Sequence, residues 1–187
     1  MNSLVSVIMP YYNKKDYFFE SINSVLNQTH TNLEIIIIYD DENKNDLEHI
    51  KNCIKNDTRV KIIFNDNNKG VSYSRNKAIS IAQGKYIAFL DCDDYWETNK
   101  IEVQLNFMLT QGYDFSHTTY RVINYNGKIV GTIRARETLK YKKLLKSCDI
   151  GLSSVILKRK LLNDMKFPEL KTKEDFVLWL RLAKESV

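Results

Sequence analysis

Three aspartates within four residues are the clearest chemical feature of this sequence, Asp91-Cys92-Asp93-Asp94. They follow an apolar run over residues 85–90 that predicts a buried strand. Because alternate side chains of an extended backbone point the same way, we expect Asp91 and Asp93 to share one side and Asp94 to face across. Carboxylates about 4 Å apart repel by roughly 1 kcal/mol even in water, so this arrangement predicts a compensating cation.

Mg²⁺ or Mn²⁺ suits such a cluster, because these ions prefer carboxylate oxygens and complete their shells with water and substrate phosphates. The spacing leaves a second interpretation open, in which the aspartates form a turn, cap the next helix and face solvent. A metal site that handles phosphates and a purely structural turn are both compatible with these four residues.

Polar residues also follow two other strand-like runs. Pro10-Tyr11-Tyr12-Asn13 comes after residues 4–9, and Asp40-Asp41 comes after residues 33–39. In open α/β sheets, ligands bind beyond the carboxyl ends of the strands. We therefore expect these groups and the aspartate cluster to meet at one edge of a sheet.

Three further positions have both a chemical and a structural interpretation. The tyrosines at 11 and 12 would stack on a base or pack in the core. Arg75, on a predicted helix, becomes functional if that helix faces the acidic edge, where it would hold a pyrophosphate or pair with an aspartate. Asp175 lies in Thr172-Lys173-Glu174-Asp175, which is close to a capping box at the start of the last helix.

The elements that must position these residues alternate in the first half of the chain. Apolar runs typical of strands alternate with runs of helical periodicity, which predicts a parallel sheet with crossover helices. The strands are expected at 4–9, 33–39, 60–64 and 85–90, and the helices at 17–26, 46–55 and 71–82. Four consecutive isoleucines in the second strand indicate burial on both faces.

The second half follows a different pattern. Asn126-Gly127 joins two strand-like stretches, 113–125 and 128–132, and predicts a hairpin. We expect helices at 99–109, 139–146 and 160–165, a strand at 153–157 and a final helix at 174–183. The final helix is apolar nearly all round and expects neighbours on every side, so we expect a further C-terminal segment to be missing.

Composition limits the remaining function classes. The 187 residues are 43% hydrophobic with a net charge of +5, which is typical of one globular domain. Three cysteines without a CxxC pair indicate a reducing compartment, and no apolar run approaches the length of a membrane span. No GxGxxG loop or catalytic triad is present, which disfavours a dinucleotide dehydrogenase and a serine or cysteine hydrolase.

Positive charge is concentrated between residues 134 and 160. This segment holds nine Lys and Arg against two acidic residues, Glu137 and Asp149. Such a segment would meet a phosphate-bearing substrate or a lipid surface, or it would form an ordinary solvated face.

Taken together, the motifs resemble the family-2 inverting glycosyltransferases, whose nucleotide-sugar-binding domain has the GT-A fold. The resemblance covers nearly the whole chain and rests on six segments in the family's order. They are 6–13 (SVIMPYYN), 24–29 (SVLNQT), 34–41 (EIIIIYDD), 70–76 (GVSYSRN), 84–94 (GKYIAFLDCDD) and 174–182 (EDFVLWLRL).

The resemblance implies a GT-A (Rossmann-like) α/β sandwich, a mostly parallel central sheet flanked by helices with a smaller acceptor-side β/α portion. Residues 1–98 would bind the nucleotide sugar, and 99–187 would form the acceptor-binding half of the same domain. The loop after the acidic pair, residues 42–45, departs from the small-residue turn usual in the family.

The resemblance also implies roles for individual residues. Asp93 would bind the metal, Mn²⁺ or Mg²⁺, and Asp175 would be the general base. The donor, a UDP-sugar, would be contacted by the remaining positions of the site: Pro10, Tyr11, Tyr12, Asn13, Asp41 at the uracil ring, Arg75, Asp91, Cys92 and Asp94.

The function expected on these grounds is metal-dependent, inverting transfer of a sugar from a UDP donor to a glycan or lipid-linked acceptor in bacterial surface polysaccharide synthesis. We expect a cytoplasmic protein, peripheral at the inner face of the cell membrane through residues 134–160, that does not bind nucleic acid. Two alternatives stay open. One is a nucleotide-sugar nucleotidyltransferase, which would need a Gly-rich loop after the first strand, and the other is a non-catalytic basic adaptor that binds nucleic acid or membrane.

Overall fold

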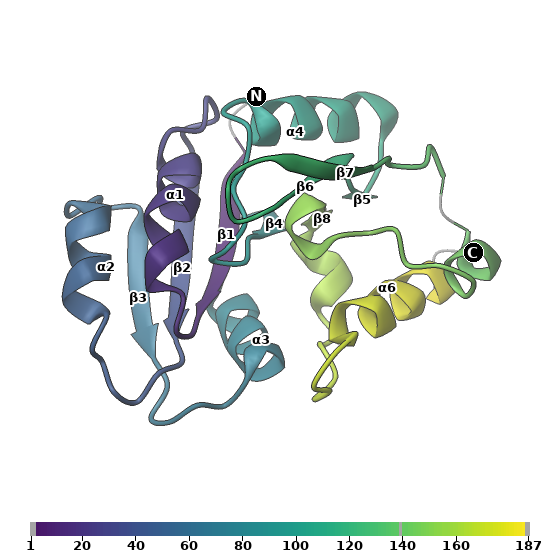
Figure 1. Cartoon of the computed structure of the whole chain (residues 1–187). Helices are drawn as coiled ribbons and strands as arrows, with labels where there is room; N and C mark the ends of the chain where they lie inside the picture. The colour runs from purple at the N-terminus through teal and green to yellow at the C-terminus, as the bar shows by residue number, and fades with distance from the viewer. Residues whose placement is uncertain (1–2, 139, 186–187) are drawn as a thin grey trace.

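A computed structural model describes residues 3–138 and 140–185 of the chain. Its centre is a six-stranded sheet with the order β3-β2-β1-β4-β8-β5 (Figure 1). The first four strands in this order are parallel, whereas β8 pairs antiparallel with both β4 and β5. Their bounds are β1 (Val5–Tyr11), β2 (Leu33–Tyr39), β3 (Val60–Phe64), β4 (Tyr86–Phe89), β5 (Phe115–Ser116) and β8 (Ile156–Lys158). The predicted mostly parallel α/β sheet is confirmed.

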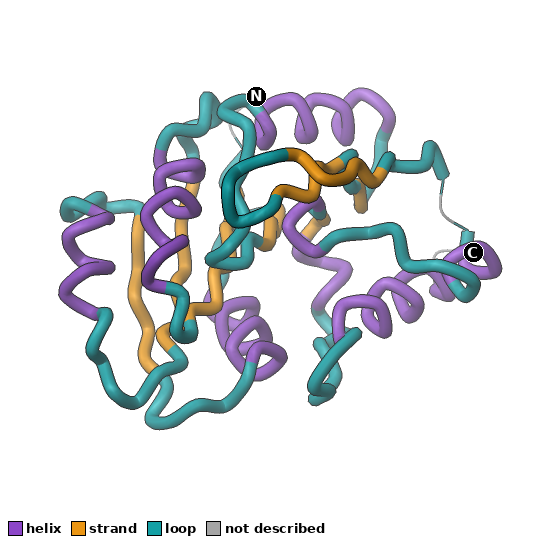
Figure 2. Tube along the Cα trace, in the orientation of Figure 1, coloured by secondary structure: helices purple, strands orange, loops and turns teal. Residues whose placement is uncertain are grey.

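Helices cover both faces of this sheet and bury two apolar cores (Figures 1 and 2). One core receives side chains from α1 (Lys15–Leu26), α2 (Leu47–Ile54) and α4 (Lys100–Gln111). The other receives side chains from α3 (Val71–Ile81), α5 (Tyr141–Leu144) and α6 (Glu174–Glu185). The β-α alternation up to β4 follows the order predicted from the sequence.

Strand β2 shows why the isoleucine run folds as an interior strand. All seven of its residues are buried. Ile35 and Ile37 belong to one core, and Ile36 and Ile38 belong to the other. Successive side chains of a strand point to opposite faces, so a continuous apolar run is what a strand covered on both sides requires.

Strand β1 extends past Pro10, where we had expected it to end. Its pairing with β4 ends at Ile8, whereas its pairing with β2 continues to Tyr11. The Val5 N–H donates to the Asn32 carbonyl, on the β2 side. Successive backbone nitrogens of a strand face opposite neighbours, so the nitrogen of Pro10 faces the β4 side. A proline there removes no hydrogen bond of the sheet.

Gly84 is required by close packing and does not end a helix. Helix α3 has already ended at Ile81. A Cβ atom on Gly84 would lie 2.6 Å from Ser6 Oγ and 2.7 Å from Ser6 N. The Gly84 N–H donates to Ser6 Oγ at 2.8 Å and to the buried Glu34 carboxylate at 3.0 Å. Because these hydrogen bonds hold the backbone in place, it could not easily move to make room for a Cβ atom.

We therefore predict that Gly84→Ala lowers the free energy of unfolding by about 1–3 kcal/mol, the usual cost of overpacking. Urea denaturation of the purified protein measures this change. Gly131→Ala is the matched control, because its Cβ would approach no atom closer than 3.8 Å. Equal stabilities of the two variants would contradict the packing explanation.

The second half differs more from the prediction. The hairpin at Asn126-Gly127 is confirmed, with strands β6 (Tyr120–Ile123) and β7 (Ile129–Ile133). However, the stretch 113–125 is not one strand, because its start forms β5 in the main sheet. The helix expected at 160–165 is a 3₁₀ turn over Arg159–Leu162. Residue 139, the expected start of another helix, lies outside the described residues. Long loops connect the elements of this second half (Figure 2).

Helix α6 closes the second core with one face. Leu178, Trp179 and Leu182 are buried, and the Trp179 ring lies 5.2 Å from Phe115 and 6.3 Å from Phe89, between ring centroids. Phe176 and Val177 are only partly buried. The expectation of neighbours on every side of this helix is therefore met on one side only.

Candidate active site

The aspartate cluster after β4 forms a tight turn. The Asp94 N–H donates to the Asp91 carbonyl at 3.0 Å, so the chain is not extended here. The extended backbone on which we based the expected directions of Asp91 and Asp93 is therefore not observed. Each carboxylate of the cluster has a different protein partner.

Asp91 belongs to a buried ion-pair bridge. Arg75 Nη2 donates to Asp91 Oδ1 at 2.8 Å, and Arg75 Nη1 donates to Glu174 Oε1 at 2.5 Å. The Arg75 side chain is 4% exposed. Burial opposes its charge, yet the two carboxylates raise the pKa of Arg75 above its ordinary value. The planar guanidinium thus ties the turn after β4 to the first residue of α6.

This bridge shows what Arg75 contacts within the protein, and its expected contact with the donor stays a prediction. Both terminal nitrogens are engaged by carboxylates, and the group is buried. Of the two roles that the sequence left open for Arg75, pairing with an aspartate is the one observed. Glu174 could not be predicted as the partner of Arg75, because the two residues lie 99 positions apart in the sequence.

Asp93 is exposed, as is Asp94, whereas Asp91 is partly buried. Its carboxylate accepts a hydrogen bond from Lys14 Nζ at 2.7 Å, and both side chains are 42% exposed. This hydrogen bond raises the pKa of Lys14. Lys14 and Arg75 therefore place positive charge beside Asp93 and Asp91, respectively.

Asp94 is held by Ser153, which donates to its carboxylate at 2.6 Å. Desolvation raises the pKa of the Asp94 carboxyl group, and the charges of Asp91 and Asp93 add to the effect. The residue as a whole is nevertheless exposed. Ser153 also accepts from the Asp91 N–H at 3.2 Å. Ser153 lies just before β8 and was missed because nothing in its local sequence marks it as a partner of the cluster.

Cys92 is buried within the turn and contacts the backbone only. Its thiol donates to the Pro10 carbonyl at 3.3 Å. Burial raises the pKa of Cys92 well above its ordinary value. The structure therefore shows Cys92 and Pro10 joining the ends of β4 and β1, and it does not leave the thiol free to contact a ligand.

The two tyrosines after β1 have different surroundings. Tyr11 is fully buried, stacks on Tyr39 at 5.2 Å between ring centroids, and donates to Asp46 at 2.7 Å. Its ring therefore belongs to the core, which corrects the expectation that it contacts a base. Tyr12 is 53% exposed, and Asn13 next to it is exposed with a φ of 48°.

The two aspartates after β2 also differ from each other in burial. Asp40 is 3% exposed and accepts from the backbone N–H groups of Lys69 and Gly70, both at 2.8 Å. It therefore holds the loop that leads into α3. Asp41 is partly buried, and its Oδ1 accepts a hydrogen bond from the Asn43 N–H at 3.0 Å. Asp41 keeps a carboxylate oxygen for another donor.

Asp175 lies at the start of α6, beside Glu174. Its carboxylate accepts from the Phe176 N–H at 2.7 Å. Burial raises the pKa of Asp175, and the charges of Glu174 and Asp91 contribute, against the opposing effect of Arg75. The helix begins at Glu174, and Lys173 before it has a φ of 63°, so the capping box with Thr172 is not formed. A carboxylate with a raised pKa is suited to accept a proton near neutral pH.

Asp93 offers a divalent metal ion a suitable first ligand. Mg²⁺ and Mn²⁺ commonly use one or two carboxylates and take further oxygens from substrate phosphates and water. Over residues 3–138 and 140–185, no three His, Cys, Asp or Glu side chains are grouped to hold a metal by themselves. The residues therefore fit a metal that is shared with a bound diphosphate, and they do not fit an all-protein metal cage.

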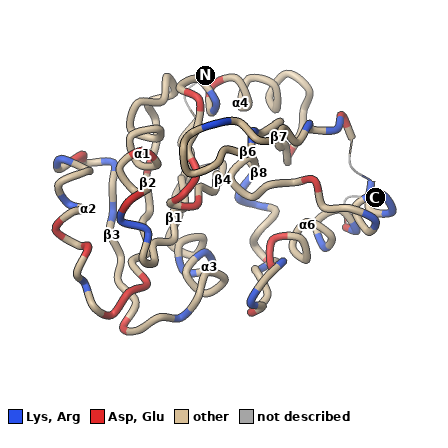
Figure 3. The backbone as a smooth tube through the Cα atoms, viewed as in Figure 1, with Lys and Arg blue, Asp and Glu red and all other residues tan. Residues whose placement is uncertain are grey.

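The basic segment 134–160 does not form one face. Lys158 and Lys160 pair with Asp114, and Arg159 Nε donates to the Gly84 carbonyl at 3.0 Å, at the edge of the sheet opposite to the acidic turn. The lysines of α5 lie elsewhere, where α5 contacts α6. Figure 3 shows Lys and Arg positions near the C-terminal mark and Asp and Glu positions beside β1.

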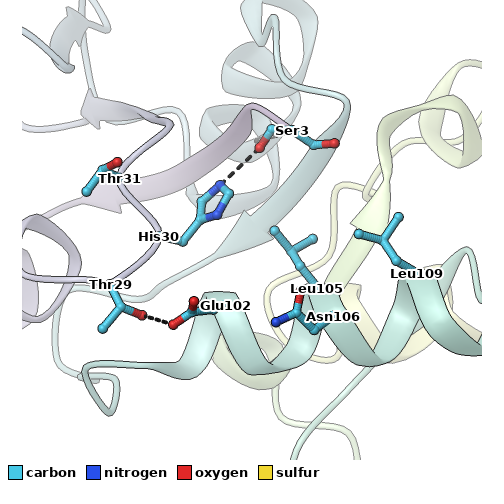
Figure 4. A pocket seen from close by; sticks show the side chains of 8 residues that line it. All are labelled: Ser3, Thr29, His30, Thr31, Glu102, Leu105, Asn106 and Leu109. Atoms are coloured by element: carbon cyan, nitrogen blue, oxygen red, sulfur yellow. Dashed lines mark hydrogen bonds between the residues drawn. The ribbon is translucent and has the colours of Figure 1, made fainter. Parts of the chain in front are cut away.

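Two cavities lie at different edges of the sheet. One, of about 250 Å³, is lined by residues that precede β1 and β2 and by α4 (Figure 4). Its polar groups are paired internally, with Thr29 donating to Glu102 at 2.6 Å and the His30 ring 3.0 Å from the Ser3 carbonyl. The other, of about 580 Å³, contains Asp175 and lies next to α5. Only the second cavity joins the site.

Comparisons with known proteins agree with this geometry. The family model described as glycosyl transferase family 2 matches residues 6–170. The chain is 43% identical over 183 residues to the UDP-Glc:alpha-D-GlcNAc-diphosphoundecaprenol beta-1,3-glucosyltransferase WfgD of Escherichia coli, covering 98% of this chain and 71% of that protein. It is 37% identical over 183 residues to the putative teichuronic acid biosynthesis glycosyltransferase TuaG of Bacillus subtilis, covering 97% and 73%.

A solved structure shares the fold. The crystal structure of S. aureus TarS 1-349 in complex with UDP has a TM-score of 0.74 and 28% sequence identity, covering 96% of this chain. The chain spans 54% of that structure. The match confirms the fold that the family resemblance implied, and the family model and the two relatives establish descent. The chain belongs to glycosyl transferase family 2.

Proposed function

We propose that this protein transfers a glucosyl group from UDP-glucose to a sugar carried on a polyprenyl diphosphate, in the synthesis of a bacterial surface polysaccharide. The donor and acceptor classes are those in the name of the relative WfgD. The observation that carries the proposal is the Arg75 bridge, because it joins Asp91, beside the donor-side carboxylates, to Glu174, beside the base candidate Asp175.

In the proposed reaction, Asp175 accepts the proton of the acceptor hydroxyl group. The hydroxyl oxygen forms a bond to the anomeric carbon from the face opposite to UDP. The bond between that carbon and the diphosphate oxygen breaks, and UDP leaves with the electron pair. Inversion at the anomeric carbon follows from this single displacement.

Asp93 would hold the divalent metal, Mn²⁺ or Mg²⁺, together with the donor diphosphate. When bound, the ion supplies positive charge at the leaving group. Lys14 pairs with Asp93 in this structure, so a metal held by Asp93 would displace the Lys14 ammonium group. Asp94 and Asp91 would contact the ribose or sugar from the same turn. Residues 1–98 would form the donor half of the domain, and residues 99–187 the acceptor half.

Residues that follow the ends of β1 and β2 would contact the uracil ring. Asp41 has an acceptor oxygen for the uracil N–H, and the exposed ring of Tyr12 would lie beside the base, with Asn13 next to it. Asp41→Ala is therefore expected to weaken UDP binding about tenfold and to leave GDP binding unchanged, because a charge-assisted hydrogen bond is lost. Competition binding with both nucleotides measures the ratio. Asp66→Ala, at an exposed aspartate after β3, is the control. An unchanged preference for UDP would overturn the assignment of Asp41.

The action of the protein would take place at the cytoplasmic face of the membrane, where a lipid-linked acceptor is available. No helix within the described ranges has the length and apolar character to cross a bilayer. The contact with the membrane would instead use the exposed lysines of α5 and the residues around it, which form part of the segment 134–160.

A thermal-shift screen tests the proposal against its two alternatives. We expect UDP and UDP-glucose, with Mn²⁺, to raise the melting temperature, because ligands that bind the folded state stabilise it. Stabilisation by nucleoside triphosphates alone would favour a nucleotidyltransferase. Salt-sensitive binding to DNA or anionic vesicles without any nucleotide effect would favour the basic adaptor.

A further inference from the structure

The cavity beside Asp175 has the size and chemistry of a ligand site. Its volume of about 580 Å³ lies within the roughly 300–1,000 Å³ of known ligand pockets. The wall consists of Tyr120 from β6, the segment after α5, and the start of α6. The lining residues are Tyr120, Leu145, Lys146, Ser147, Cys148, Ile150, Gly151, Lys173, Asp175 and Phe176.

Two lysines give this cavity positive charge around the base candidate. Lys146 and Lys173 line it, and neither forms an ion pair with a residue that the structure describes. Lys158 and Lys160, two other cations of the basic segment, are by contrast neutralised within the protein by Asp114. The two cavity lysines are therefore available to an anionic ligand.

The position of Lys173 is defined by its backbone. Its φ of 63° puts it in the left-handed region, which strains the backbone of a residue other than glycine. Lys173 immediately precedes α6 and stands two positions before Asp175. A lysine therefore occupies the position before the N-terminus of α6, although a glycine or asparagine would adopt this backbone conformation with less strain.

The rest of the lining suits a sugar and an alkyl chain. The Tyr120 ring lies so close to the backbone that a Cβ atom on Gly151 would be 2.9 Å from Tyr120 Cε1. Gly151 therefore lets the aromatic ring lie against the cavity wall, where it offers an apolar face. Leu145 at the end of α5 is 54% exposed and adds an apolar rim.

We infer that this cavity binds the acceptor, and that Lys146 and Lys173 bind the diphosphate between the acceptor sugar and its lipid. This inference rests on the proposed function, because it identifies the ligand that delivers the hydroxyl group to Asp175. The sugar lies against Tyr120, the diphosphate lies between the two ammonium groups, and the lipid leaves over Leu145. The donor diphosphate occupies the separate position at Asp93.

Equilibrium binding tests the inference independently of catalysis. The probe is a decyl diphosphate of N-acetylglucosamine, titrated into the full chain without divalent metal. We expect Lys146→Gln and Lys173→Asn each to weaken binding about tenfold, because each removes a charge-assisted contact. Lys142→Gln, an exposed lysine of α5 outside the cavity lining, is the control and keeps the affinity of the unmodified chain. Asparagine tolerates the left-handed conformation, so the Lys173 variant is expected to fold.

Two further arms identify the group that is recognised. A decyl glycoside of N-acetylglucosamine, which lacks the diphosphate, should bind equally to the lysine variants and to the unmodified chain. Excess UDP should not displace the diphosphate probe. Unchanged affinity of both lysine variants for the diphosphate probe, equal losses for the glycoside, or displacement by UDP would each overturn the inference.

The same variants separate this inference from the proposed function. In transfer assays, they should raise the KM for the diphosphate acceptor about tenfold and leave the KM for UDP-glucose unchanged. If the unmodified chain binds the diphosphate probe through both lysines but does not use UDP-glucose, the proposed donor fails and the acceptor subsite stands.

Discussion

Replacing Asp175 with asparagine should lower the rate of sugar transfer by about 10²–10⁴-fold, the usual contribution of a general base. The affinity for UDP should not change, because the carboxylate faces the acceptor cavity and bonds only to the Phe176 N–H among its described neighbours. Steady-state kinetics and UDP titration measure the two quantities. Asp164→Asn, an exposed acid of the same half, is the control. A variant with near-normal turnover would eliminate Asp175 as the base.

The pH dependence gives a second measure of the same residue. Burial and neighbouring carboxylates raise the pKa of Asp175, so kcat/KM should increase with pH through a value above that of an ordinary aspartate, about 3.9. This limb should vanish in Asp175→Asn. The contribution of Asp175 to the stability of the fold changes with pH in the opposite direction. Because its pKa is raised, the folded state binds this proton more tightly than the unfolded chain. The stabilisation by protonated Asp175 is therefore complete at low pH and disappears as the pH rises through the folded-state pKa.

Replacing Arg75 with methionine should lower the free energy of unfolding by about 3–5 kcal/mol, because it leaves two carboxylates without their buried partner. For a chain of this size that corresponds to a fall in melting temperature of roughly 10 °C. Transfer activity should fall as well, since Asp91 and the start of α6 lose their common anchor. Calorimetric unfolding measures the stability, and Arg181→Met, an exposed arginine of α6, is the control.

Two companion variants show whether charge or geometry is responsible. Arg75→Lys keeps the charge but cannot bridge Asp91 and Glu174 with a planar fork, so it should recover only part of the stability. The triple change of Arg75 to Met, Asp91 to Asn and Glu174 to Gln should recover more, because no buried charge is left unpaired. Full stability of Arg75→Met alone would contradict the bridge.

Much of the fold could be predicted because it is encoded locally. Strand β2 was predicted at its observed bounds, since four isoleucines in a row fit only a strand with both faces covered. The hairpin at Asn126-Gly127 was predicted from its turn residues alone. The 3₁₀ turns around β8 and the division of 113–125 between two sheets were not, because tertiary pairing decides them.

The site could be predicted as a set of positions but not as a set of contacts. Parallel pairing of β2 and β4 with β1 puts Asp41, Asp91 and Asp93 beyond the same end of the sheet, as the strand ends in the sequence predict. The partners of the acidic turn, by contrast, come from distant segments: Lys14, Arg75 and Ser153. No local pattern connects them, and the same long-range packing removed Tyr11 from the ligand side. The basic segment 134–160 likewise divides between two edges of the molecule.

The central claim is that Asp93 binds a divalent metal together with the diphosphate of UDP, and calorimetric titration of UDP tests it directly. In the presence of Mn²⁺ the unmodified chain should bind UDP, and chelation of the metal should abolish this binding. Asp93→Ala should bind UDP weakly and to the same extent with and without Mn²⁺, whereas Asp66→Ala should behave like the unmodified chain. Metal-dependent UDP binding that persists undiminished in Asp93→Ala would contradict the account.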